Sequence, residues 1–180
     1  MGTEPTAAEN EPGPALLALY DDALPHVYGY LLSRCGGHVA VAQDLTTQTF
    51  LAAVQAVRRD AGARPSRPWL MTVARNKLVD HWRRQAREER GLRTVAADQA
   101  SFHDPWDAEL DHLRVQAVLA RLSAHHRMVL TLRYLDDLPV PEVAVLAGRN
   151  LHATEALLVR ARAAFRRAYT TDDEGEVPDA

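Results

Sequence analysis

The sequence predicts an all-α protein of two small helical domains joined by a flexible acidic linker. Ala, Leu and Arg dominate the 180 residues while aromatic residues make up 6%, a composition that favours helices over sheets. Apolar residues recur at three- and four-residue steps, which is the spacing of one buried helical face. Between 91 and 111 this periodicity is lost and an Asp104-Pro105 pair appears, as is typical of a linker.

Three helices are predicted before the linker, after an acidic, Pro-rich head over 1–13 that we expect to be disordered. The first runs from 15 to 33, with Pro25 expected to kink it. The second runs over 38–58, after a turn at Gly36-Gly37. The third runs from about 68 to 89, with Ser66 as its cap and Pro68 in its first turn. The positions expected on buried faces of the first two helices are Leu16, Leu19, Ala23, Val27, Tyr30 and Leu31, then Val41, Leu45, Thr49 or Phe50, Ala53 and Val57.

The third predicted helix has an apolar side that includes two tryptophans and an opposite side rich in Arg and Lys. We expect Trp69 in the core, because a large aromatic residue on an apolar face is more often buried than used to stack a base. For Trp82 both interpretations stay open.

The second domain is predicted to hold two helices between about 105 and 135, with Ser123 as cap of the second. Pro139 then begins a short helix that ends at Gly148, a residue suited to the left-handed conformation after a helix end. A last helix runs over 152–169, and the acidic tail 170–180 is expected to be disordered. A short helix, a tight turn and a longer basic helix form a helix-turn-helix pattern.

The charge of the chain is unevenly distributed. The net charge of −3 argues against a nucleic-acid partner when the chain is taken as a whole. Residues 58–93, however, contain eleven basic and four acidic side chains, and 149–167 contain five basic and one acidic. Acidic stretches occupy 1–25, 98–111 and 170–180. A charge run is most often a solvated face, but two basic blocks on predicted helices favour contact with phosphates.

Several classes of protein are disfavoured. A single Cys cannot form an internal disulfide, and neither a signal peptide nor a membrane span of ~20 apolar residues is evident, so we expect a cytoplasmic protein. No nucleophile elbow, Gly-rich phosphate loop or His-Glu-x-x-His motif is present, so neither an enzyme nor a cofactor is expected. Cys35 and His38 lack a second pair of ligands at zinc-site spacing, so no metal site is predicted.

Two sets of motifs resemble a known family. The runs Gln43 to Leu51 and Trp69 to Asp80, with Arg83-Arg84, look like region 2 of a bacterial sigma factor of the sigma-70 family. The runs Leu119 to Leu138, Pro141 to Ala144 and Arg160 to Phe165 resemble region 4. Sigma factors of the extracytoplasmic-function group, which keep only these two regions, are the most similar. The resemblance covers about 15–168 and implies region 2 over 14–90, a linker over 91–111 and region 4 over 112–169.

The resemblance implies a transcription initiation factor that binds core RNA polymerase, through the coiled coil of its largest subunit and its flap, and recognises promoter DNA. On the second predicted helix, Asp44, Gln48 and Thr49 would contact the coiled coil. Alternatively, they are only the solvent-exposed face of an amphipathic helix. An anti-sigma factor that masks both domains is the usual family arrangement, although nothing in the sequence identifies one. The linker would thread toward the polymerase active-site cleft.

Region 2 would open and hold the −10 promoter element, which requires stacking surface, base-edge hydrogen bonds and cations for the backbone. Asn76 is the best reader of a base edge because its amide can donate and accept, and Arg83 and Arg84 are assigned to phosphates. The residues expected to contact the −10 element are Arg64, Arg67, Arg75, Asn76, Lys77, Arg83 and Arg84.

Region 4 would place its last helix in the major groove of the −35 element, with Arg149, His152, Thr154 and Glu155 toward the bases. Arg160 is either a backbone contact or a charge on the helix face. Many relatives have Thr-Val-Lys-Ser-Arg where this chain has Ala153 to Leu157. Glu155 can accept a hydrogen bond from cytosine N4 but repels phosphate, so promoter preference should differ. Alternatively, Glu155 only favours the first turn of its helix through the dipole.

Two other classes of function remain open from the residues. A dimeric helix-turn-helix regulator would bind duplex operators as an isolated chain and would self-associate. A helical scaffold with merely charged faces would not bind polymerase. Both leave the motifs between 38 and 89 without a purpose.

Overall fold

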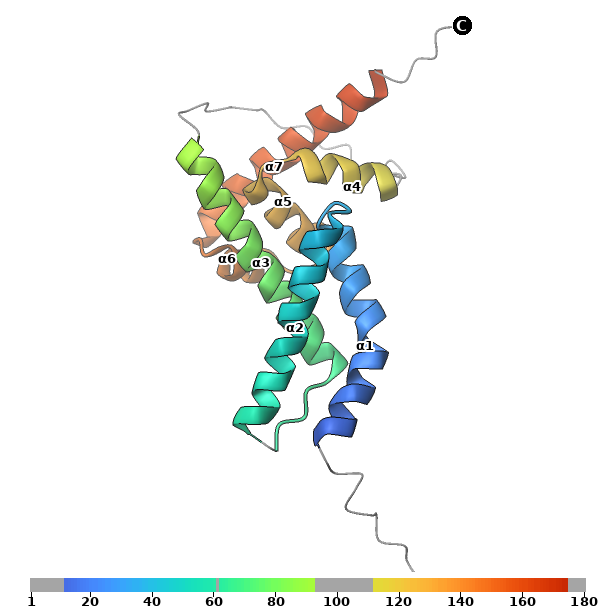
Figure 1. Cartoon of the computed structure of the whole chain (residues 1–180). Helices are drawn as coiled ribbons and strands as arrows, with labels where there is room; N and C mark the ends of the chain where they lie inside the picture. Colours follow the sequence, from blue (N-terminus) through green and yellow to red (C-terminus); the bar gives the residue numbers. More distant parts are fainter. Residues whose placement is uncertain (1–11, 61, 93–111, 175–180) are drawn as a thin grey trace, which may run out of the picture. The chain divides into compact units, whose positions relative to one another are not determined.

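The computed structural model describes residues 12–60, 62–92 and 112–174, and the regular elements in these ranges are helical (Figure 1). The prediction of an all-α protein is confirmed. The chain forms two compact units, Met1–Leu78 and Val79–Ala180, which meet inside a helix. Of the expected linker over 91–111, residues 91–92 are helical, and 93–111 lie outside the described residues, as do most of the head and the end of the tail.

The first unit begins with a pair of helices, α1 (Pro12–Arg34) and α2 (Val39–Arg59), which pack side by side (Figure 1). α1 starts at Pro12, so two residues of the expected disordered head are helical; Pro is tolerated there because N–H groups of the first turn have no partner within the helix. Pro25 lies inside α1, which continues to Arg34. Gly36 and Gly37 have φ of 64° and 78°, a backbone conformation that allows the tight turn into α2.

The core of the first unit is a stripe of small and aliphatic side chains from α1, α2 and the start of α3 (Arg67–Leu92). Tyr20 of α1 packs edge-on against Phe50 of α2, with ring centroids 4.8 Å apart. Ser66 caps α3, its Oγ accepting from the Trp69 N–H at 3.4 Å, as predicted. The fully buried residues of this core include Ala23, Val27, Leu31, Ala42, Leu45, Thr49, Ala53, Leu70, Ala74 and Leu78.

The two tryptophans of α3 differ in environment. Trp82 is 1% exposed, which settles its open interpretation in favour of the core. Trp69 is 37% exposed, so the prediction that it is a core residue is wrong. The buried stripe of α3 in the first unit is carried by Leu70, Ala74 and Leu78, four residues apart, and Trp69 stands beside that stripe. α3 also continues to Leu92, beyond the predicted end near 89.

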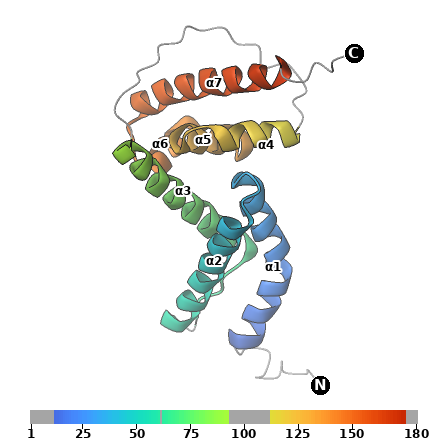
Figure 2. The same cartoon turned by 45° about the horizontal axis from the view of Figure 1, so that its top comes forward.

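The second unit contains the rest of α3 and the C-terminal helices. These are α4 (His112–Arg121), α5 (Ala124–Leu130), the π-helical segment η2 (Thr131–Leu135), α6 (Val140–Ala147) and α7 (Leu151–Glu174). α7 contacts α4, α5 and α6 along its length, and Figure 2 shows it running beside them. The buried residues include Val118, Met128, Val129, Leu132, Val143, Leu158, Ala161 and Phe165.

The ends of these helices follow the predicted chemistry with two corrections. Gly148 has φ 65° at the C-cap of α6, and Pro139 stands at its N-cap. Ser123 occupies the N-cap of α5 but its hydroxyl makes no capping bond; instead the carboxylate of Glu89 accepts from the Ala124 N–H, with both oxygens 3.2 Å away.

The second correction concerns the tail. α7 continues to Glu174, so 170–174 belong to the helix and not to a disordered segment. Thr170 and Thr171 donate their hydroxyls to carbonyls of the preceding turn, at Arg166 and Arg167, and thus remain compatible with a helical backbone.

Candidate polymerase and nucleic-acid interfaces

The face of α2 predicted to meet polymerase is only partly exposed. Asp44 is exposed and its Oδ2 accepts from Gln48 Nε2 at 2.8 Å, so the two polar side chains are held together one turn apart. Thr49 is fully buried and donates its hydroxyl to the Leu45 carbonyl at 2.8 Å. Its prediction as a contact residue is therefore corrected, because its side chain has no surface to offer a partner.

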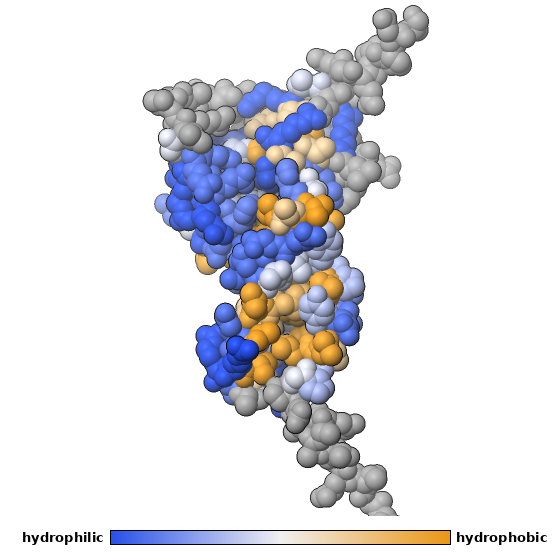
Figure 3. All heavy atoms as spheres, in the orientation of Figure 1, coloured by the Kyte–Doolittle hydropathy of each residue, from blue (hydrophilic) through white to orange (hydrophobic). Residues whose placement is uncertain are grey.

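An apolar residue completes this face. Leu51 is 51% exposed and stands seven residues after Asp44, which brings it to the same side of the helix. The sequence did not single it out, although its spacing from Asp44 and Gln48 was a usable signal. Figure 3 shows apolar side chains gathered on the visible face of the first unit, over α1 and α2. Asp44, Gln48 and Leu51 form the α2 face.

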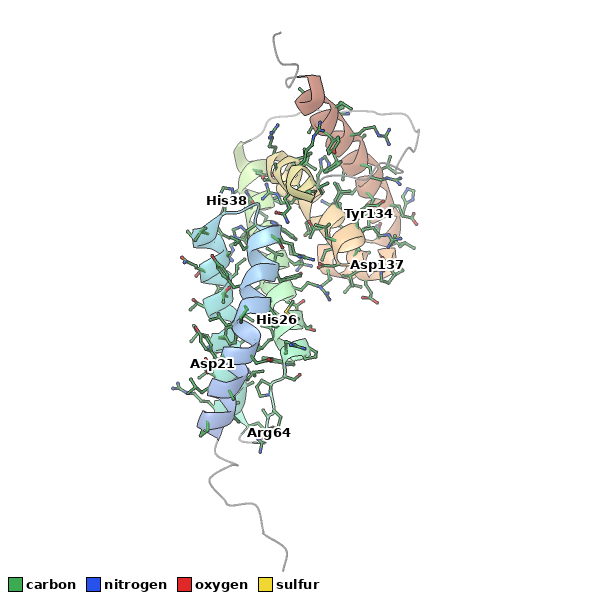
Figure 4. The ribbon with its side chains drawn as sticks, turned by 90° about the vertical axis from the view of Figure 1, so that its right-hand side faces the viewer. Asp21, His26, His38, Arg64, Tyr134 and Asp137 are labelled. Atoms are coloured by element: carbon green, nitrogen blue, oxygen red, sulfur yellow. The ribbon has the colours of Figure 1, made fainter. Side chains whose placement is uncertain are left out.

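The loop before α3 carries exposed cations. Arg64 is exposed and lies in the loop at one end of the first unit (Figure 4). Arg67 is exposed at the start of α3 and lies 3.8 Å from Asp22 of α1, an ion pair in which both side chains are about half accessible. Such a pair is weak, so a phosphate can replace Asp22 as the partner of Arg67.

The N-terminal part of α3 brings an aromatic and an amide to the surface. Trp69 is exposed next to Arg67, and Asn76 is exposed further along the helix, while Arg75 and Lys77 are half-buried. Trp69 is a candidate stacking residue that the sequence reasoning placed in the core. The first unit therefore combines the three kinds of group that a displaced DNA strand requires: an aromatic face, an amide and several cations.

The remaining two predicted −10 residues, Arg83 and Arg84, belong to the second unit. Arg84 is exposed. Arg83 is half-buried: its Nη2 donates to the Val145 carbonyl of α6 at 3.3 Å and its Nη1 lies 3.7 Å from Asp80. Within the second unit, the structure therefore engages Arg83 with α6.

The predicted helix-turn-helix is formed by α6 and α7. Gly148 ends α6, and Asn150 begins α7 by accepting from the Ala153 N–H at 2.8 Å through its side-chain oxygen. This is a side-chain N-cap, which the sequence pattern did not predict. Asn150 and Gly148 together determine where α7 starts, and so which residues lie on its first turns.

The N-terminal turns of α7 present three of the predicted −35 residues. His152, Glu155 and Arg160 are exposed, and Arg149 is half-buried in the turn. Thr154 is fully buried and donates to the Asn150 carbonyl at 2.9 Å, so its prediction as a base contact is corrected. Glu155 is the fifth residue of α7 and lies outside its first turn, which weakens the interpretation that it only favours the helix dipole.

The described residues form neither a membrane-spanning helix nor a metal-binding cluster. None of the helices described is long and apolar enough to cross a membrane. Within the same ranges, no group of three His, Cys, Asp or Glu side chains is placed to hold a metal ion. The one cysteine, Cys35, is buried near the end of α1.

Comparison with known proteins identifies two regions of the chain. The family model for Sigma-70 region 2 matches residues 19–88, and that for Sigma-70, region 4 matches 112–165. The ECF RNA polymerase sigma factor BldN of Streptomyces coelicolor is 34% identical over 165 residues, covering 86% of this chain and 60% of that protein. The ECF RNA polymerase sigma factor SigL of Mycobacterium tuberculosis is 37% identical over 136 residues, covering 73% of this chain and 75% of that protein.

A solved structure shares the fold. The sigma factor RpoE of Bartonella quintana, determined in complex with the anti-sigma factor NepR, superposes with a TM-score of 0.51 at 21% identity. The match covers 85% of this chain and 95% of that one.

The helix-turn-helix of α6 and α7 lies in the part of the chain that matches region 4, and it is a feature of DNA-binding helical proteins. The chain belongs to the sigma-70 family, in which it is an RNA polymerase sigma factor of the extracytoplasmic-function group. It directs transcription initiation, and the family is not enzymatic.

Proposed function

We propose that the α2 face binds the coiled coil of the largest subunit of core RNA polymerase. Leu51 supplies exposed apolar surface, and the bonded pair of Asp44 and Gln48 supplies polar groups already held in one geometry. An apolar centre with a polar rim is the usual anatomy of a protein interface. Region 4 makes a second contact, at the polymerase flap.

The proposed −10 interface consists of exposed and half-buried side chains of α3 and of the loop before it. Trp69 stacks on a base displaced from the duplex, and Asn76 reads a base edge. Arg64, Arg67, Arg75 and Lys77 attract the backbone. Arg84 adds a phosphate contact, and Arg83 becomes available when it leaves the Val145 carbonyl. The observation that carries this proposal is the exposure of Trp69, an aromatic side chain that the apolar pattern alone would bury.

The proposed −35 interface is the N-terminal half of α7. Arg149, His152 and Glu155 face the base edges of the major groove, and Arg160 contacts the backbone. The carboxylate of Glu155 accepts from cytosine N4. Because the family resemblance implies a Lys in many relatives where this chain has Glu155, we expect the preferred −35 sequence to differ from theirs.

Regulation by an anti-sigma factor forms part of the proposal. It rests on the fold shared with the RpoE chain of Bartonella quintana, which was solved in complex with the anti-sigma factor NepR. Since RNA polymerase works in the bacterial cytoplasm, the protein acts there.

The proposal is tested by run-off transcription with core RNA polymerase on a library of genomic promoter fragments, with and without the protein. We expect new start sites that depend on the protein and that disappear with Leu51→Ser. Leu17→Ser on α1 also removes an exposed apolar side chain and serves as the matched control. The absence of dependent start sites with any related core enzyme would contradict the proposal.

The rival function is a dimeric helix-turn-helix regulator of duplex operators. It predicts dimers in solution and tight duplex binding without polymerase. Sedimentation of the free chain and duplex titration separate the two functions, because the sigma-factor proposal expects a monomer that needs polymerase for productive promoter binding.

A further inference from the structure

A basic pocket of about 430 Å³ lies within the second unit. One wall is the last turns of α3, and the other is the start of α5 with the turn between α6 and α7. Its lining residues are Arg83, Arg87, Arg90, His125, Ala147, Gly148 and Arg149. Four of the seven are arginines, and no carboxylate is among these described lining residues.

The positive charge of the pocket is largely uncompensated. Arg83 is the exception, since its Nη1 lies 3.7 Å from Asp80. Arg90 donates Nε to the Ala86 carbonyl of its own helix, and Arg149 Nη2 lies 3.5 Å from His125 Nε2. Within the part of the chain that the structure describes, Arg87, Arg90 and Arg149 have no carboxylate partner. The positive charges that line one cavity repel each other, so a bound anion would stabilise this arrangement of arginines.

The pKa of His125, which lines the same pocket, is lowered. Burial is the main cause that lowers its pKa from 6.5 to about 4, and the charges of Arg149, Arg90 and His126 add to it. Its Nδ1 is buried without a hydrogen-bond partner among the described residues. Because Nε2 faces a guanidinium donor, the ring proton is placed on Nδ1, which leaves His125 with an unused N–H.

We propose that this pocket binds a small polyphosphate, such as pyrophosphate or the diphosphate or triphosphate group of a nucleotide. Guanidinium groups bind phosphate oxygens in pairs, and the volume lies in the usual range for small-ligand sites. A phosphate monoester carries about −1.5 to −2 charges at pH 7 and a polyphosphate more. A phosphodiester of DNA carries only one negative charge, so a polyphosphate matches four arginines better than the DNA backbone does.

Occupation of the pocket has a consequence that rests on the proposed function. Arg83 and Arg149, assigned to the −10 and −35 elements, line the same pocket. The two elements lie about 25 base pairs apart, roughly 85 Å along the duplex at 3.4 Å per base pair, so both arginines cannot stay in the pocket and contact DNA together. A bound polyphosphate therefore holds the protein in a form that does not engage the promoter.

Binding is tested by isothermal titration of the full chain with pyrophosphate, with sulfate as the general anion and an unrelated short duplex as the DNA arm. The variant is Arg87→Gln with Arg90→Gln, two pocket residues with no assigned promoter contact. The control is Arg58→Gln with Arg59→Gln, which removes the same charge from exposed positions of α2. Far-ultraviolet circular dichroism verifies that both variants fold.

We expect pyrophosphate to bind the wild type more tightly than sulfate, and the pocket variant to bind it about tenfold or more weakly, with the control unchanged. Nuclear magnetic resonance should show the His125 pKa rising toward 6.5 on binding. Equal weakening in pocket and control variants, or no binding at millimolar pyrophosphate, overturns the proposal. The proposal is also overturned if the duplex displaces pyrophosphate from the wild type and binds more weakly to the Arg87 and Arg90 variant, because the pocket would then be a DNA site.

The regulatory consequence has a separate readout. Pyrophosphate should reduce promoter-complex formation by the wild type more than by the Arg87 and Arg90 variant. If titration shows binding while promoter binding is unaffected, the link to promoter recognition is contradicted and the pocket itself stands. If no promoter responds to the protein at all, the proposed function fails independently of the titration result.

Discussion

At the scale of single residues, the exposure of an aromatic or hydroxyl side chain decided its role. Trp69 was assigned from its helical position and lies beside a buried stripe, whereas the contact roles of Thr49 and Thr154 came from the family resemblance and both side chains are fully buried. Neighbouring positions are 100° apart around a helix, so a residue next to a buried stripe can face either the core or solvent. Packing places Trp69 outside and the two threonines inside, where their hydroxyls bond to the preceding turn.

Trp69→Ala should impair promoter opening about tenfold or more, because stacking on an aromatic side chain contributes about 1–3 kcal/mol per base. Trp69→Phe should retain most of the activity. Opening kinetics measured by permanganate reactivity, beside duplex binding of the holoenzyme, would separate this effect from weaker initial binding. Tyr134→Ala removes an aromatic of similar exposure from the second unit and is the control. An equal defect in the Tyr134→Ala variant would contradict the assignment of Trp69 to the −10 interface.

Glu155→Lys should change the preferred −35 sequence and steepen the salt dependence of promoter binding by about 0.9 in the log–log slope, the value for one added phosphate contact. The measurement is selection from a randomised −35 library at several salt concentrations. Glu142→Lys makes the same charge change on α6 and should leave base preference unaltered. Unchanged preference in Glu155→Lys would return this residue to a structural role.

At the scale of elements, helix ends are determined by contacts between segments distant in sequence. The carboxylate of Glu89 in α3 accepts a hydrogen bond from the first N–H of α5. Ser123 occupies the N-cap position, but its hydroxyl makes no capping hydrogen bond. Arg127 of α5 reaches back to α4, donating Nε to the Leu119 carbonyl at 2.9 Å and Nη2 to those of Ala120 and Leu122. Local signals predicted where helices start, but not these partners.

Arg127→Met should lower the free energy of unfolding by about 3 kcal/mol, because it leaves carbonyls at the end of α4 buried without donors. Arg127 is only 7% exposed, so water does not replace the guanidinium freely. Urea denaturation of the full chain measures the loss. Arg160→Met, at an exposed position of α7, should change stability by less than about 0.5 kcal/mol. Similar losses in the two variants would show that the carbonyl contacts are dispensable.

Gly148→Ala and Gly29→Ala should have opposite effects. Gly148 has φ 65°, and a Cβ there would lie 3.2 Å from Arg83 Nη2, so Ala should cost about 1–2 kcal/mol. Gly29 lies within α1 with nothing within 4 Å of a Cβ, so Ala should stabilise by about 0.5–1 kcal/mol. Thermal unfolding of both variants tests the sign. Stabilisation by Gly148→Ala would contradict the turn geometry.

At the scale of the whole molecule, charge is concentrated where function is assigned. The net charge of −3 hides two basic blocks between acidic stretches. One block supplies the exposed cations of the first unit, and both supply arginines to the pocket of the second. The sequence showed the blocks but not the pocket, because Arg83, Arg87 and Arg90 come from one helix and Arg149 from a turn about sixty residues later.

The second unit should lose stability as pH falls from about 6.5 to about 4. His125 has a pKa of about 4 in the folded chain and 6.5 as its ordinary value, so between these values the unfolded state binds more protons and stability rises with pH. His125→Gln should flatten this slope, whereas His152→Gln, at an exposed position, should not. Urea midpoints measured from pH 4 to 7 give the slopes. Equal slopes in wild type and His125→Gln would show that His125 does not titrate differently on folding.

The sequence by itself determined the helical class, the order of the helices, the caps at Ser66 and Gly148, and the family, because these depend on local periodicity and on motifs contiguous in the chain. Only the tertiary structure decided the exposure of Trp69 and Leu51, the burial of Thr154, and the convergence of arginines around His125. Those properties depend on which surfaces pack against each other, and a pattern with the period of one helix does not contain that information.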